Sequence, residues 1–243
     1  MTNTQPSVRY DRWSVYSLYA FAVLAFGGSL FAAGFLPPWD PTWDANQIAE
    51  LYQTKGFGIQ IAMMMLMLEC ALYLPFCAIT SELIEKRLGM PLMAKIQFSS
   101  GIAAIAFGMM AVAAWGIAAF RPERDPQITQ LMNDMGWIVF FWDIAFFQLQ
   151  GAVVMFATFF YKGPNPVWPR WMGYMFVVGV LGVFPAYGVI MFKTGWLAYN
   201  GLIGYWFQVI AFGLMLLPWS WYCLVALKDD EPMLCLICFQ VLD

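Results

Sequence analysis

The sequence contains no histidine. Imidazole is the usual ligand of bis-histidine haem groups, of membrane di-iron oxygenases and of most copper and zinc sites. Thiolate or carboxylate metal sites would remain, but the carboxylates are scattered along the chain. We therefore expect neither a metal site nor a cofactor.

Charged residues are also scarce. They make up 11% of the 243 residues, whereas hydrophobic residues make up 62%. Soluble domains contain about a quarter charged residues, so this chain has too little polar surface for a water-soluble protein. The net charge of −3 includes no basic block, which argues against a nucleic-acid partner. The aromatic content of 19%, with 12 Trp, suits a protein with two membrane interfaces.

The cysteines do not form a recognisable site. Cys70, Cys77 and Cys223 lie in apolar runs and are expected to be small core residues. Cys235 and Cys238 form a single C-x-x-C pair near the end of the chain, and one such pair is weak evidence for metal or redox chemistry. We interpret residues 227–243 as a short cytoplasmic tail on the membrane surface.

Long apolar segments alternate with loops rich in proline, glycine and charge. Six segments reach the about 20 residues that a membrane-spanning helix needs; they cover residues 14–36, 56–80, 95–120, 136–161, 170–192 and 200–226. The sequence therefore predicts an all-α, polytopic bundle of six transmembrane helices that forms a single transmembrane domain over residues 1–243.

Lysine and arginine favour one orientation of this bundle. With a cytoplasmic N-terminus, the cytoplasmic side holds Arg9, Arg12, Lys86, Arg87, Lys95, Lys162, Arg170 and Lys228, and the outer side holds Lys55, Arg121, Arg124 and Lys193. Cytoplasmic loops carry an excess of these residues, so both ends are expected to be cytoplasmic. We expect the protein in the inner membrane of a bacterial cell.

Two outer loops contain amphipathic segments. In "DPTWDANQIAELYQTKG", Asp44 is a good N-cap residue, and Ile48, Leu51 and Tyr52 follow at helical spacing. The segment "DPQITQLMNDMGW" repeats the pattern. We expect two short helices that lie on the outer face, either as a lid over the bundle or as ordinary interfacial helices.

Four polar residues lie inside the predicted spans. The helical rise places Asp143 about 10 Å and Gln208 about 12 Å below the outer ends of their spans, and Glu69 and Gln150 about 20 Å below theirs. A charged side chain in the bilayer interior is costly and commonly functional. We therefore expect these four residues to face the bundle interior as ligand-binding or proton-linked groups.

Matching depths suggest two hydrogen-bonded pairs, Asp143 with Gln208 and Glu69 with Gln150. A glutamine amide can donate to a carboxylate or accept from a protonated acid. These groups would form a polar cavity for a ligand or a proton, or else interhelical hydrogen bonds that fix helix rotation. No nucleophile accompanies them, so we assign no catalytic residue.

Two stretches, "RPERDPQITQLMNDMGW" at 121–137 and "VWPRWMGY" at 167–174, resemble those of six-helix bacterial inner-membrane proteins of unknown function. The resemblance extends over most of the chain and implies a six-helix inner-membrane protein. It implies no activity, so no catalytic residue follows from it.

Three functions fit these observations. The first is binding or transport of a small hydrophobic molecule, supported by the aromatic content and by Pro75, Pro185 and Pro218, which interrupt spans. The second is a non-catalytic accessory or structural subunit of a larger membrane complex, supported by helix faces rich in Gly and Met. An enzyme that uses Glu69 or Asp143 as an acid or base has the least support. The expected partners are the lipid bilayer, a small hydrophobic ligand, and other membrane subunits or further copies of the chain.

Overall fold

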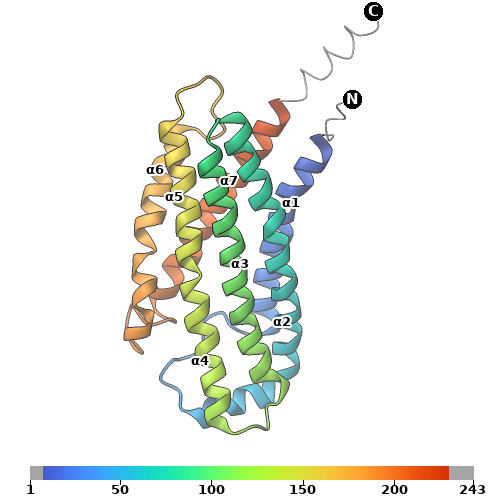
Figure 1. Ribbon diagram of the computed structural model, residues 1–243. Helices are drawn as coiled ribbons and strands as arrows, with labels where there is room; N and C mark the ends of the chain where they lie inside the picture. The colour runs from blue at the N-terminus through green and yellow to red at the C-terminus, as the bar shows by residue number, and fades with distance from the viewer. Residues whose placement is uncertain (1–7, 230–243) are drawn as a thin grey trace, which may run out of the picture.

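The computed structural model describes residues 8–229, which form a bundle of long helices without a β-strand (Figure 1). The α-helices are α1 (Val8–Phe26), α2 (Ala45–Glu82), α3 (Pro91–Phe120), α4 (Pro126–Trp142), α5 (Ile144–Phe160), α6 (Arg170–Gly182) and α7 (Phe207–Asp229). Three π-helical segments, η1 (Gly27–Ala32), η2 (Leu83–Arg87) and η4 (Leu202–Trp206), and one 3₁₀ segment, η3 (Phe184–Met191), flank them. Cys235, Cys238 and most of the predicted tail lie outside the described residues.

Five helical stretches of the described chain are long and apolar enough to cross a membrane. They are Ala45–Arg87, Pro91–Phe120, Pro126–Phe160, Arg170–Met191 and Leu202–Lys228. The predicted all-α fold class is thus confirmed, and its helices are apolar and long enough for a membrane protein. The first predicted span is helical from Val8 to Ala32 through α1 and η1, but it is not one of these five stretches.

The amphipathic segment after Asp44 is the beginning of α2 and not a separate helix. The Asp44 carboxylate accepts hydrogen bonds from the backbone N–H groups of Asn46 and Gln47, at 2.9 and 3.0 Å, and the Gln47 side chain accepts one from the Asp44 N–H. This capping box starts the helix as the sequence predicts. The helix then continues through Gly56 and Gly58 for 38 residues, because glycine weakens a helix without ending it.

The second amphipathic segment is likewise continuous with its neighbour, but that helix is interrupted at Asp143. Helix α4 ends at Trp142 and α5 starts at Ile144. The Asp143 N–H donates to the Val139 carbonyl at 3.1 Å. Aspartate is a poor residue for a helix interior and a good one for a helix boundary, which agrees with an interruption at Asp143.

The helices form a closed ring. In spatial order, α1 contacts α2, α2 contacts α3, α3 contacts α4 and α5, α5 contacts α6, α6 contacts α7, and α7 returns to α1. The start of α1 and the end of α7 lie at the same end of the bundle (Figure 1). With α4 and α5 counted as one interrupted helix, six helices surround the centre of the ring, and side chains fill it at two levels.

Two separate apolar clusters fill the ring. One surrounds Tyr73, Phe76, Phe176 and Trp219 at the end that holds the described chain ends. The other surrounds Trp115 and Trp137, whose ring centroids are 5.0 Å apart, at the opposite end. Tyr199 stacks on Trp137 in the second cluster, with centroids 5.2 Å apart and planes inclined by 7°.

The aromatic cluster requires glycine at position 136 of α4. A Cβ added there would lie 2.6 Å from the Cε2 atom of Trp115. Gly136→Ala should therefore push α3 and α4 apart and lower the free energy of unfolding by about 1–3 kcal/mol. Denaturant unfolding of the detergent-purified protein, followed by tryptophan fluorescence, measures this change.

Gly116→Ala on α3 is the matched control. Its added Cβ would lie 3.7 Å from the Met63 Cγ atom, which is an ordinary contact. Replacing a helical glycine by alanine stabilises a helix by up to about 1 kcal/mol, so this variant should be at least as stable as the natural protein. Equal losses in the two variants would contradict the packing of α3 against α4.

Candidate functional site

A cavity of about 430 Å³ lies between the two apolar clusters. Its wall includes Phe21 and Trp219 from the first cluster and Trp115 and Trp137 from the second. All seven α-helices contribute residues to it. The cavity is therefore the unfilled middle of the helix ring.

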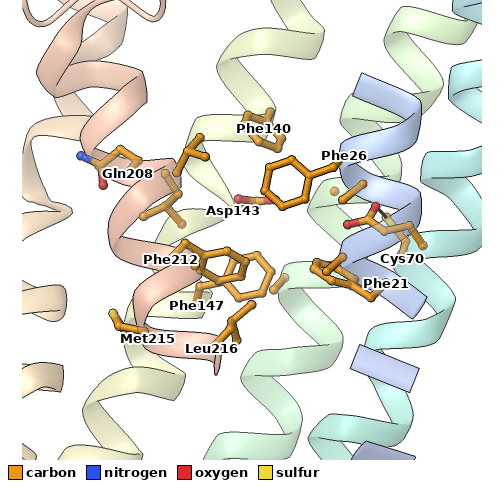
Figure 2. A pocket seen from close by; sticks show the side chains of 18 of the residues that line it. Phe21, Phe26, Cys70, Phe140, Asp143, Phe147, Gln208, Phe212, Met215 and Leu216 are labelled. Carbon is orange, nitrogen blue, oxygen red and sulfur yellow. Dashed lines mark hydrogen bonds between the residues drawn. The ribbon is translucent and has the colours of Figure 1, made fainter. Parts of the chain in front are cut away.

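The wall is predominantly aromatic and aliphatic. Figure 2 shows Phe21, Phe26, Phe140, Phe147 and Phe212 around the space, on α1, α4, α5 and α7. The Phe147 and Phe212 rings meet edge to face, with centroids 5.0 Å apart. A wall of this kind, with few polar groups, is typical of pockets for small apolar molecules.

Asp143 is the most buried acid on this wall. Its side chain is 5% exposed and points into the space in Figure 2. Although Asp143 precedes α5, its side chain does not cap that helix. Within residues 8–229 the carboxyl group has neither a hydrogen-bond partner nor an ion-pair partner. Because an unpartnered buried acid costs stability, a contribution to stability does not explain why an aspartate is present at this position.

Glu69 and Cys70 on α2 lie near Asp143. Glu69 is half-buried and lines the cavity. The Cys70 thiol donates to the Glu69 Oε2 atom at 3.8 Å. On α3, a Cβ added at Gly108 would lie 3.5 Å from the Cys70 Sγ atom and 3.6 Å from the Asp143 Oδ2 atom. The two acids thus belong to one polar region beside Gly108.

The predicted pair of Asp143 and Gln208 is wrong. Gln208 is 6% exposed and lines the same cavity, but its Nε2 atom donates to the Ile203 carbonyl at 3.1 Å. In Figure 2 its amide points away from Asp143. The acceptor, Ile203, lies in η4, the π-helical turn just before α7, and is five residues from Gln208 in the sequence. The Gln208 Oε1 atom has no partner among the described residues.

The predicted pair of Glu69 and Gln150 is also wrong. Gln150 is fully buried and joins three helices by other bonds. Its Oε1 atom accepts from the Tyr73 hydroxyl at 2.9 Å, and its Nε2 atom donates to the Gln97 carbonyl at 3.1 Å and to the Cys77 Sγ atom at 3.3 Å. These bonds connect α5 with α2 and α3. Gln150 therefore makes an interhelical connection and is not part of the cavity wall.

Gln148 on α5 is not among the site residues predicted from the sequence, yet it lines the cavity. Its Nε2 atom donates to the Val180 carbonyl at 2.5 Å, and its Oε1 atom accepts from the Tyr187 hydroxyl. Pro185 lies at the start of the 3₁₀ segment η3, where the regular helix of the fifth span ends. The hydrogen bond between Tyr187 of η3 and Gln148 of α5 was not evident from hydropathy.

The chemistry of the wall is limited to acids, amides, hydroxyls and a thiol. No Lys or Arg of the described chain lines the cavity. Residues 8–229 also contain no group of three or more Cys, Asp or Glu side chains that could hold a metal ion. The arrangement can therefore receive an apolar body, accept hydrogen bonds at the two acids, and exchange protons there.

The fold and the cavity define a class, that of α-helical multi-pass membrane proteins with an internal apolar chamber. Comparison with protein-family models, with curated protein sequences and with solved structures finds no match to this chain. The function must therefore be argued from the chamber itself.

The unpartnered state of Asp143 leads to a stability prediction. Asp143→Leu removes a buried polar group without removing a hydrogen bond, so it should leave the free energy of unfolding unchanged or raise it by about 1 kcal/mol or more. Gln150→Leu should lower it by about 1–3 kcal/mol, because Tyr73 and Gln97 lose their partner. Parallel denaturant titrations in one detergent measure both changes.

Asp143→Asn is the isosteric companion variant and should also fold like the natural protein. If Asp143→Leu were as destabilising as Gln150→Leu, the carboxyl group would have a structural partner, and the interpretation of this site as a functional one would be wrong.

Proposed function

We propose that this protein binds or transports a small hydrophobic molecule in the central cavity. The observation that supports this most directly is the 430 Å³ space lined by aromatic rings, with two acids at one place on its wall. Pockets for small molecules have volumes of about 300–1,000 Å³ and combine apolar walls with a few polar groups. The cavity falls within that range.

The polar groups on the wall have separate roles in this proposal. Asp143 and Glu69 contact the polar part of the ligand, and Gln208 forms part of the wall around it. Gln150 holds α2, α3 and α5 together behind the site. Unpartnered acids inside a membrane protein commonly mark substrate or ion pathways, which favours a ligand over a purely structural role.

We further propose six membrane spans, with α1 and η1 as the first, both chain ends in the cytoplasm, and a bacterial inner membrane as the location. The described ends of the bundle lie together (Figure 1), as an even number of crossings requires. Eight of the 12 Lys and Arg residues fall on the side assigned to the cytoplasm.

Cysteine labelling tests this orientation. In a background without the natural cysteines, Asn46→Cys should react with a membrane-impermeant maleimide added to intact cells, because Asn46 is exposed at the outer end of α2. Lys162→Cys, in the exposed loop between α5 and α6, should react only after the membrane is permeabilised. The reverse pattern would overturn the orientation.

Filling the cavity tests the binding function. The fluorescent probe 9-anthracenemethanol should accept energy from the tryptophans of the wall, and this signal should saturate. Gly108→Leu extends a side chain into the space beside Asp143 and should weaken probe binding at least about tenfold, because overpacking costs 1–3 kcal/mol. Ala106→Leu is the matched control, since Ala106 is exposed on the same helix and should leave binding unchanged.

The competing proposal is an accessory subunit of a membrane complex. Probe binding that is equal in the natural protein, Gly108→Leu and Ala106→Leu would show partition into detergent and would count against a ligand chamber. Stoichiometric co-purification of other membrane proteins under mild detergent would then favour the subunit proposal.

A further inference from the structure

We propose that the cavity selects lipophilic cations, namely protonated amines with an aromatic or aliphatic body, whose ammonium group lies between Glu69 and Asp143. This inference rests on the proposed binding function and names the class of ligand. It follows from the charges on the wall, from the state of Asp143 and from the rings around it.

The first support is the unpartnered acid. Asp143 is only 5% exposed and lies on the cavity wall. It has no hydrogen-bond or ion-pair partner among residues 8–229. Figure 2 shows its carboxyl group directed into the space. A buried carboxylate is stable only when it is paired and hydrogen-bonded. A ligand that supplies N–H donors and positive charge would meet this requirement from inside the cavity.

The second support is the presence of another acid at the same place. Glu69 lines the cavity from α2, and the Cys70 thiol that donates to it lies beside Gly108, as the Asp143 carboxyl group does. Like charges in one low-dielectric site repel each other, and no Lys or Arg of the described chain reaches this wall to neutralise them. Two acceptors without a protein cation form a site that is complementary to an ammonium group, which has up to three N–H donors.

The third support is the aromatic wall. Phe26, Phe140, Phe147 and Phe212 surround Asp143 in Figure 2. Aromatic faces attract organic cations, most strongly where water is excluded. The same rings would cover the apolar body of the ligand. They therefore suit a molecule that is charged at one end and apolar elsewhere, and they give no advantage to an anion.

Gly108 keeps this region open. The position of a Cβ at residue 108 is 3.5 Å from the Cys70 Sγ atom and 3.6 Å from the Asp143 Oδ2 atom. An atom placed there would be in van der Waals contact with both groups. The absence of a side chain at Gly108 thus leaves room beside the carboxyl group for a ligand head group.

Three fluorescent probes with the same tricyclic body test the inference. They are 9-(aminomethyl)anthracene, which is cationic at neutral pH, 9-anthracenemethanol, which is neutral, and 9-anthracenecarboxylate, which is anionic. Each is titrated into the full-length protein in a neutral detergent, and energy transfer from tryptophan gives the dissociation constant. The cation should bind at least about tenfold more tightly than the alcohol, and the anion should bind more weakly than the alcohol.

Variants assign the preference to the acids. Asp143→Asn and Glu69→Gln keep the shapes of the side chains and should each reduce the preference for the cation over the alcohol at least severalfold, while binding of the alcohol persists. Asp134→Asn is the matched control, because Asp134 lies on α4 away from the cavity wall and should leave the preference unchanged.

The outcomes separate the two proposals. If the alcohol binds in a manner that depends on Gly108 but the cation binds no better, the cation inference fails and the hydrophobic binding function stands. If no probe shows binding that Gly108→Leu weakens, the binding function itself fails. A cation preference that survives both acid variants would also overturn the inference, because the selectivity would arise elsewhere.

Discussion

The contact between α7 and α1 closes the helix ring, and the central cavity depends on it. The Ser220 hydroxyl on α7 donates to the Tyr19 hydroxyl on α1 at 3.2 Å, and Trp219 packs edge to face against Phe76, with ring centroids 5.2 Å apart. These contacts hold α7 at one end of the ring. Lipid contributes no hydrophobic force that would press helices together. The central cavity, which Trp219 bounds at one end, can therefore remain open.

Buried polar residues in this protein have two different fates. Gln150 makes bonds to three groups on two other helices, as a residue that stabilises a bundle should. Asp143 has no such bonds, although both lie on the segment from Pro126 to Phe160. A protein that retains a costly unpartnered acid sacrifices stability at that position, as active and binding sites often do. This contrast is the physical reason for treating the cavity as a candidate functional site.

Hydropathy predicted the helices because every backbone polar group in a bilayer must be bonded within the chain, and capping rules predicted the start of α2 at Asp44. The polar pairs were not predictable from depth alone. Gln150 accepts a hydrogen bond from Tyr73, and Gln208 donates one to a carbonyl of the adjacent π-helical turn η4. Helix rotation and the order of neighbouring helices decide which polar groups meet. The cavity could not be predicted either, because the apolar composition of the helices does not determine their order around the ring.

The length of α2 has a consequence for how the protein sits in a bilayer. Its 38 residues extend over about 57 Å, well beyond the about 30 Å of hydrocarbon, and Figure 1 shows α2 and α4 passing the end of α6. A helix of this length can span a thin bilayer as well as a thick one, so its length does not fix the position of the protein in the membrane. The shorter stretch Arg170–Met191 is better matched to the bilayer, and it has the exposed indole of Trp171 at its start and that of Trp196 shortly after its end. Tryptophan is enriched at membrane–water interfaces, so in a bilayer bounded by these two rings the ends of α2 and α4 that pass beyond α6 would extend into the water.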